Sequence, residues 1–351
     1  MNGKEIDADS QITDGSYNAK RNEKWHDEIE QAKGKFFKGK KLAHGCYLCD
    51  VDEEKASNKE YRFFAKKKYS KQGDTLGTTD EEYILNTALM QCLTNAPNII
   101  YVFKDYIIQQ RINTNASAEI NKRNAARLAL LETIHGLVDR KPENAFTNTN
   151  GKLVNLDFEN AVTKFAYSYS NLANGGFPNE HMLKQGLLPY QTSDLLEELK
   201  TLGKIDYEKF LTIYRETCNL CNVDKEKAQK ALNDFMSRAF SYKQLLVDKI
   251  KKEIKEITGE KKKLYEKLLK YCEEDLSSFQ AFQEKNKDVK IETIDKSKKP
   301  NNNNIKWHGI GCRFIRGIKK FWKWFKSLGY CANNNRAARN LRSGNSCWYQ
   351  R

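Results

Sequence analysis

The chain has few prolines, no long apolar run and no dense cysteine framework. With only 5 prolines, 39% hydrophobic residues and 30% charged residues in 351 positions, the composition predicts a helix-rich protein with a large solvated surface. No apolar run reaches the ~18 residues that a transmembrane helix needs, and the polar residues 1–5 do not resemble a secretory signal. The 9 cysteines do not indicate a disulfide framework. We therefore expect reduced thiols, a cytoplasmic location and no membrane-spanning segment.

The net charge of +15 is concentrated at the C-terminal end. Residues 305–351 contain 11 Lys or Arg, no Asp or Glu, and 4 of the 5 tryptophans. Within this tail, apolar residues recur at helical spacing and basic residues occupy the other sides. The apolar positions are Phe314, Ile318, Phe321, Phe325 and Leu328. An aromatic side opposite a basic side is typical of a helix that lies in the headgroup region of an anionic, phosphoinositide-containing membrane.

Two other interpretations of the tail stay open. The apolar side could instead dock on the rest of the protein, with the lysines merely solvated. The tail could also bind nucleic acid or a calmodulin-like partner. No RNA-binding motif accompanies the basic residues, so nucleic acid is the weaker of these partners.

The most informative segment lies between residues 135 and 159. Asp139, Lys141 and Asn144 follow one another closely, and Asp157 comes 13 residues after Asn144. This set resembles the catalytic loop and metal-binding segment of protein kinases. Phosphoryl transfer needs a carboxylate near the attacking hydroxyl and oxygen ligands that hold Mg²⁺ against the phosphates of ATP. The resemblance implies that Asp139 is the base, that Lys141 stabilises the transferring group, and that Asn144 and Asp157 bind Mg²⁺ or Mn²⁺.

Local patterns around this segment predict its secondary structure. Helical spacing precedes it at Leu128, Leu131, Ile134 and Leu137. Short apolar segments at 145–146 and 153–156 flank the polar turn 147–151, which predicts two small strands. Such a ribbon would bring Asn144 and Asp157 to one edge. The alternative is a helix end, a loop and a strand, with acidic residues that only face water.

Upstream residues resemble the N-lobe of a kinase. Lys66 is similar to the strand lysine that holds the α- and β-phosphates of ATP, with Lys67 as the alternative. Glu81 is similar to the helix glutamate that orients this lysine. Gln109 and Gln110 end a segment similar to the strand that leads to the hinge, where backbone groups would meet adenine.

Three departures from the kinase pattern affect the expected mechanism. Gly45 is the one glycine left in the segment that aligns with the glycine-rich loop, so backbone amides there have less freedom to approach phosphates. Val138 replaces an arginine that binds a phosphorylated activation loop in many kinases. Glu159 replaces the glycine of the Asp-Phe-Gly segment, and Asp-Phe-Glu also occurs in choline-kinase-like and aminoglycoside-phosphotransferase-like enzymes. A small-molecule kinase, and a membrane-tethered pseudokinase adaptor, are therefore the rival functions.

We expect an α+β chain with a two-lobed protein-kinase-like fold, a small β-rich N-lobe and a helical C-lobe. The predicted parts are an N-terminal extension (1–36), the N-lobe (37–112), the C-lobe (113–292), a linker (293–304) and a basic amphipathic tail (305–351). The C-lobe includes a helical hairpin predicted from two apolar stripes. These stripes contain Leu246, Ile250, Ile254 and Ile257, then Leu264, Leu268 and Tyr271.

The expected activity is transfer of phosphate from ATP to Ser or Thr of a protein substrate. Because the phospho-loop partner is missing, a polyanion such as an inositol phosphate could be the activator, bound by lysines near the hairpin. The candidates are Lys243, Lys249, Lys251, Lys252 and Lys255, although a solvated helical side is the favoured explanation for these lysines. A divergent kinase with a lipid-binding tail resembles effectors that intracellular bacteria deliver into host cells, which implies a peripheral membrane location there. The oligomeric state is left open by the sequence.

Overall fold

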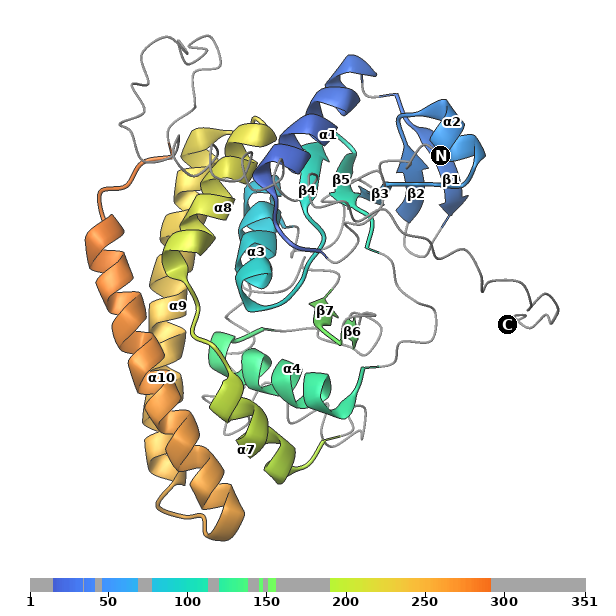
Figure 1. Cartoon of the computed structure of the whole chain (residues 1–351). Coiled ribbons are helices and arrows are strands. Elements are labelled where there is room, and N and C mark those ends of the chain that lie inside the picture. The colour runs from blue at the N-terminus through green and yellow to red at the C-terminus, as the bar shows by residue number, and fades with distance from the viewer. Residues whose placement is uncertain are drawn as a thin grey trace, which may run out of the picture. The chain divides into compact units, whose positions relative to one another are not determined.

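The computed structural model describes residues 15–33, 35–41, 46–68, 78–112, 120–137, 145–147, 151–155 and 190–291. The chain divides into two compact units, Met1–Ile294 and Asp295–Arg351, and all described residues belong to the first. This unit has an antiparallel sheet in its N-terminal region and helices in its C-terminal part (Figure 1). The α+β class predicted from the sequence is confirmed at this level.

Five strands form one antiparallel sheet in the order β1-β2-β3-β5-β4. The strands are β1 (Phe37–Lys41), β2 (Cys46–Asp50), β3 (Phe63–Lys67), β4 (Ile99–Val102) and β5 (Tyr106–Gln110). A short helix, α2 (Glu53–Ser57), connects β2 to β3, and a longer helix, α3 (Asp80–Leu93), connects β3 to β4. Since β3 pairs with β2 on one side and with β5 on the other, it is the middle strand.

Different helices cover the two faces of the sheet. Successive residues of a strand point to opposite faces, so Ile107 and Ile108 of β5 belong to separate apolar clusters. Ile108 shares its cluster with Trp25 of α1 (Ala19–Gln31), while Ile107 shares its cluster with Tyr83 of α3. Trp25 is only 2% exposed. The first helix is therefore an integral layer of the sheet region and not a loose extension.

A partly buried arginine joins α1 to the sheet. Arg62, just before β3, donates from Nε (2.9 Å) and Nη2 (2.7 Å) to the two carboxylate oxygens of Asp50. Its third nitrogen, Nη1, donates to Glu28 of α1 at 2.7 Å. Burial acts to raise the pKa of Asp50, but the hydrogen bonds from Arg62 hold that pKa below its usual value. The planar guanidinium makes these bonds in parallel, which a lysine cannot do.

The third helix begins with a reciprocal cap and is buried on most sides. The Thr79 hydroxyl accepts from the Glu82 N–H at 3.2 Å, and the Glu82 carboxylate accepts from the Thr79 N–H at 2.9 Å. α3 contacts both β4 and α8 (Tyr207–Leu220). Apolar residues occur around most of its circumference, as expected for a helix enclosed by protein.

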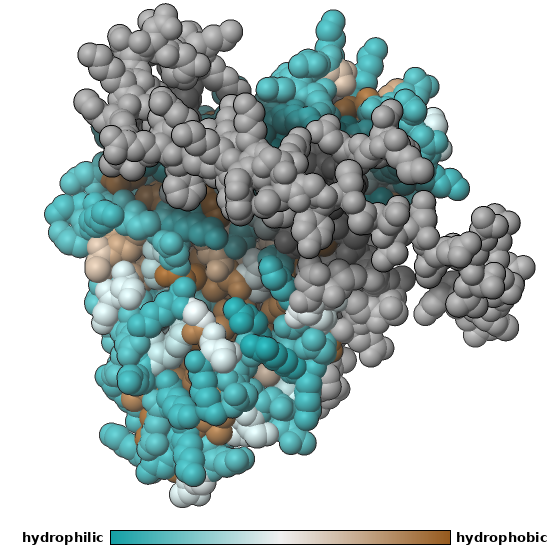
Figure 2. Space-filling view, in the orientation of Figure 1, coloured by the Kyte–Doolittle hydropathy of each residue, from teal (hydrophilic) through white to brown (hydrophobic). Residues whose placement is uncertain are grey.

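The C-terminal part is built from long helices. Besides α8, it contains α4 (Lys122–His135), α7 (Thr192–Thr201), α9 (Lys225–Glu253) and α10 (Gly259–Asn286). α9 and α10 run side by side as a hairpin (Figure 1). They bury Leu246, Ile250, Leu264 and Leu268, and the side of this part visible in Figure 2 is mostly hydrophilic. In the described ranges, no helix combines the length and apolarity needed to cross a lipid bilayer.

A small two-stranded ribbon lies between the five-stranded sheet and α4 (Figure 1). It consists of β6 (Ala145–Thr147) and β7 (Leu153–Asn155), which pair in antiparallel fashion. Asn95, after α3, donates from its N–H to the Leu153 carbonyl at 3.2 Å. Asn124 of α4 donates from Nδ2 to the Gly151 carbonyl at 3.1 Å. The ribbon is thus attached to helices from both parts of the unit, and its two strands are the ones predicted from the sequence.

Candidate functional site

The side chain of Lys66 on β3 points towards α3. Its residue is 7% exposed, and its ammonium nitrogen lies 5.6 Å from the centroid of the Tyr83 ring. The neighbouring strand residue, Lys67, is exposed. A buried ammonium is costly unless charge or hydrogen bonds compensate for it, and the electron-rich face of Tyr83 supplies one such contact. Of the two sequence candidates for a phosphate-binding lysine, only Lys66 is enclosed by protein.

Gln109 lies on the same side of the sheet and is held by the same tyrosine. The Tyr83 hydroxyl donates to Oε1 of Gln109 at 3.3 Å. Gln109 is 3% exposed, and its Nε2 has no hydrogen-bond partner within the described ranges. Buried amide N–H groups in proteins are nearly always hydrogen-bonded, so this donor is suited to an acceptor atom of a bound molecule. Lys66, Tyr83 and Gln109 together bring a cation, an aromatic ring and an amide donor to one place.

Gln110 points to the opposite face of the sheet. Its Oε1 accepts from Nδ2 of Asn98 at 2.5 Å and from Nη2 of Arg21 in α1 at 3.2 Å. Its backbone N–H donates to the Asn98 carbonyl at 2.8 Å. The side chain of Gln110 therefore attaches α1 to the sheet, and its N–H is bonded to the residue before β4. A role of this residue in binding adenine stays a prediction.

Glu81 lies near α8. It is 6% exposed, and burial together with the nearby Glu81 carboxylate raises the pKa of the Cys218 thiol in α8 to about 12. Between the described residues Glu81 and Lys66, no ion pair is formed. Residues two apart on a helix do not share a face, so Glu81 and Tyr83 point in different directions. Glu81 as the partner of Lys66 stays a prediction, and Tyr83 is one residue in contact with Lys66.

Sequence reasoning did not single out Tyr83. Nothing in its local pattern separates it from the other apolar residues of α3, because that helix is apolar around most of its circumference. Tyr83 can be identified as a candidate only when it is known which side of α3 faces β3 and β5. Tertiary packing, not spacing, selects this residue.

The predicted catalytic and metal-binding residues lie at or beyond the edges of the described ranges. Asp139, Lys141, Asn144, Asp157 and Gly45 all fall outside the described residues. Asn144 immediately precedes β6, and Asp157 follows β7 by two positions. Ala145 pairs with Asn155, so the chain enters β6 and leaves β7 at the same end of the ribbon.

This ribbon contacts the chain that follows β5. Val154 of β7 forms a small apolar cluster with Ile112, which comes two residues after Gln110. Val154 is fully buried and Ile112 is 8% exposed. Leu153 and Ala145 belong to the same core as Tyr83 and Ile107. The two regions singled out by the sequence therefore share one apolar core, although 44 positions separate Gln110 from Val154 (154 minus 110).

The candidate metal ligands suit a hard divalent cation by their chemistry. Asn144 offers an amide oxygen and Asp157 a carboxylate, the oxygen donors that Mg²⁺ and Mn²⁺ prefer. Among the residues that the structure describes, no group of three or more His, Cys, Asp or Glu is placed to hold a metal ion. Comparison with protein-family models, with curated proteins and with solved structures gives no match to this chain.

Proposed function

We propose that this chain is an ATP-dependent phosphotransferase with a kinase-like fold that phosphorylates Ser or Thr of a protein substrate. The observation that supports the proposal is the β6–β7 pairing, because Ala145, which follows Asn144, pairs with Asn155, two positions before Asp157. Val154 of this ribbon packs against Ile112, which follows β5. Along the chain, the strand with Lys66 (β3) is followed by helix α3 and then by strands β4 and β5. This order also agrees with the one expected from the resemblance.

The proposed roles follow from the chemistry of phosphoryl transfer. Asp139 accepts the hydroxyl proton of the substrate, and Lys141 stabilises charge on the transferring group. Asn144 and Asp157 hold a divalent cation that, when bound, neutralises phosphate charge. Lys66 binds the α- and β-phosphates. Gln109, whose Nε2 lacks a partner among the described residues, borders the nucleotide next to Tyr83.

Two features favour a protein substrate over a small molecule. Lys141, Pro142 and Glu143 resemble the corresponding positions of protein kinases, and Asn144 is only 13 residues from Asp157. A choline- or aminoglycoside-type kinase remains the rival enzyme. The rival of a different class is a pseudokinase adaptor, which the poor glycine-rich segment around Gly45 supports.

We also propose that the basic tail recruits the enzyme to anionic, phosphoinositide-containing membranes. The tail lies outside the described residues, and its sequence pattern is the support for this step.

For activation by an inositol phosphate, one of the candidate lysines is removed by burial: Lys243 is 5% exposed and paired with Asp275. Lys249 and Lys251 are paired with Glu253 and Glu273. Lys252 and Lys255 are the exposed candidates that remain.

Mass spectrometry of the purified chain after incubation with ATP and Mg²⁺ or Mn²⁺ tests the proposal. We expect phosphate on Ser or Thr of the chain itself or of added protein. Asp157→Ala and Asp139→Asn should each remove this product, whereas Asp248→Ala, an exposed position on α9, should retain it. An adaptor would yield no product with any substrate. Product on choline or an aminoglycoside, without any on protein, would favour the small-molecule kinase.

A further inference from the structure

A charged cluster is buried where α4, α8, α9 and α10 meet. It consists of His135, Tyr207, Lys243 and Asp275, one residue from each helix. Their exposures are 4%, 6%, 5% and 1%. The Lys243 ammonium forms an ion pair with Oδ2 of Asp275, and the Tyr207 hydroxyl donates to Oδ1 of Asp275 at 2.8 Å. Nζ of Lys243 also lies 3.4 Å from Nδ1 of His135. We call these four residues the Lys243 cluster.

The charge states within the cluster fix the direction of its hydrogen bonds. Burial, reinforced by the charge of Lys243, lowers the pKa of His135 to about 3, so its ring is neutral near pH 7. Burial acts to raise the pKa of Asp275, but Lys243, His135 and the bonds from Lys243 and Tyr207 hold it below its usual value. The ammonium of Lys243 can only donate, so Nδ1 of His135 must be the acceptor. His135 therefore carries its proton on Nε2.

Only one side of the His135 ring is held. Nε2 is buried and has no hydrogen-bond partner among the residues that the structure describes. His135 lines a small cavity together with Leu89 of α3 and Tyr242 of α9. Within the described part of the chain, the bond from Lys243 to Nδ1 is thus the polar contact that orients the ring. Lys243 in turn is oriented by Asp275.

The hairpin contacts the last turn of α4 at a second point. Tyr242, the neighbour of Lys243, donates from its hydroxyl to the Thr133 carbonyl at 2.6 Å. α4 ends at His135 and is capped by Gly136, whose left-handed backbone (φ 62°) lets the chain turn away. Leu137 is then buried at 1% exposure. Two positions later the chain reaches Asp139, the predicted base.

A buried ion pair is a costly way to fill a core, since apolar residues of similar size are often as stable or more so. Its benefit is directional, because each of its hydrogen bonds fixes an orientation. We propose that Lys243 and Asp275 are positioning residues for phosphoryl transfer: through His135 they orient the end of α4 and the segment that follows it. On this proposal the α9–α10 hairpin contributes to catalysis by orienting the end of α4. This inference depends on the proposed function.

Matched substitutions at His135 test the proposal. In His135→Asn the amide oxygen can still accept from Lys243, whereas His135→Leu has no acceptor. We expect His135→Asn to keep kcat close to that of the unmodified chain. His135→Leu should lower kcat by about tenfold to a hundredfold, with little change in KM for ATP, because misplacing reacting groups by about an ångström has effects of that size. The double variant Lys243→Met/Asp275→Asn should behave like His135→Leu, and removing both charges avoids leaving one unpaired in the core.

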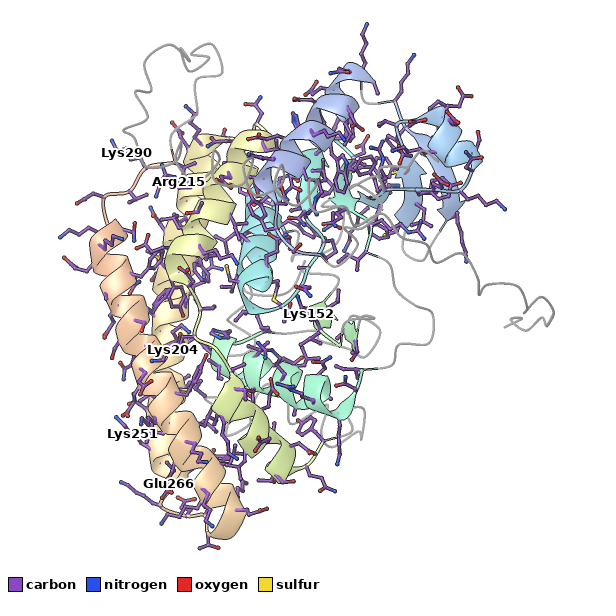
Figure 3. The ribbon with its side chains drawn as sticks, in the orientation of Figure 1. Lys152, Lys204, Arg215, Lys251, Glu266 and Lys290 are labelled. Carbon is purple, nitrogen blue, oxygen red and sulfur yellow. The ribbon has the colours of Figure 1, made fainter. Side chains whose placement is uncertain are left out.

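A second ion pair between the same two helices provides the control. Lys251 and Glu273 are 2.9 Å apart and about half exposed, and Lys251 lies on the outside of the hairpin (Figure 3). Lys251→Met/Glu273→Gln should leave kcat unchanged. Wild-type kcat in folded His135→Leu and in the double cluster variant would overturn the positioning role while leaving the kinase proposal intact.

A readout without catalysis separates the two proposals. If the unmodified chain transfers no phosphate, the proposed function fails, and amide hydrogen exchange at Gly136 and Leu137 still tests the cluster. We expect faster exchange there in His135→Leu than in His135→Asn, and ¹⁵N NMR should show the ring protonated on Nε2. Equal exchange in both variants, or a proton on Nδ1, would overturn the proposed orientation.

Discussion

The ammonium of Lys66 lies 5.6 Å from the centre of the Tyr83 ring, and the hydroxyl of that ring is bonded to Gln109. This relationship links β3, α3 and β5 through one aromatic side chain. The Tyr83 ring limits the positions that the ammonium of Lys66 can occupy. Its hydroxyl binds Oε1 of Gln109, so Nε2 is the amide atom left for another molecule. A movement of α3 would therefore change both groups together.

Lys66 and its neighbour Lys67 form a natural pair for testing ATP binding. Lys66→Met should reduce kcat/KM for ATP by at least about a hundredfold, since it removes a charge-assisted contact worth roughly 1.5–3 kcal/mol and misplaces the phosphates. Lys67→Met should have an effect within about twofold, because Lys67 is exposed. Steady-state kinetics with varied ATP measures both. The reverse order of effects would show that Lys67 is the phosphate-binding residue.

Replacing Arg62 by lysine should destabilise the protein. It bonds both oxygens of Asp50 and also Glu28, and a single ammonium cannot reproduce these parallel bonds. We expect Arg62→Lys to lower the free energy of unfolding by about 1.5–3 kcal/mol, the range for hydrogen bonds to charged groups. Urea unfolding measures the change.

The control for Arg62 is another arginine in an exposed pair. Arg238 lies 3.7 Å from Asp234, and both side chains are 47% exposed. Arg238→Lys should change the free energy of unfolding by less than about 0.5 kcal/mol. Equal effects at the two sites would mean that the bonds between α1 and the sheet contribute little.

Acid should destabilise the protein partly through His135. The pKa of His135 is lowered from 6.5 to about 3 by burial and by Lys243, so between these values the unfolded chain binds a proton that the folded chain does not. Unfolding is then favoured as pH falls. This contribution of His135 to the free energy of unfolding is fully present above pH 6.5, the pKa of the residue in the unfolded chain. It is lost as pH falls from 6.5 towards 3. Between pH 8 and pH 5 we expect a loss of about 2 kcal/mol from this residue alone.

Chemical denaturation of the unmodified chain and of His135→Asn at both pH values measures this contribution. The variant has no imidazole, so its unfolding free energy should fall less between pH 8 and pH 5. Parallel losses in the two proteins would show that His135 does not titrate on unfolding as described. Asp275, whose pKa lies below its usual value, contributes stability that is lost only at still lower pH.

Local patterns predicted several elements because their causes are local. Apolar spacing at Leu128, Leu131 and Ile134 identified the buried side of α4, and all three residues are buried. Two short apolar segments around a polar turn identified the ribbon that became β6 and β7. Strand and helix periodicities are properties of neighbouring residues, so they can be read without knowledge of the fold.

Lys243 shows where that reasoning failed. It was expected on a solvated lysine-rich side, yet it lies on the buried stripe of α9 between Ala239 and Leu246. Asp275 occupies a similar place on the buried stripe of α10, between Cys272 and Phe279. A lysine and an aspartate on two apolar stripes indicate a buried pair only when the stripes are known to face each other. The spacing was visible, but the pairing was not.

By itself, the sequence determined the buried side of α4, the two strands of the β6–β7 ribbon, the α9–α10 hairpin, the α+β class and the set of residues from Asp139 to Asp157 that suggests phosphoryl transfer. Only the tertiary structure decided that Tyr83 contacts Lys66, that α1 covers the sheet, and that Lys243 reaches His135 across more than a hundred positions. The reason is physical: periodicity records which side of an element is apolar, whereas burial of charge depends on which partner lies opposite, and that is settled when the elements pack.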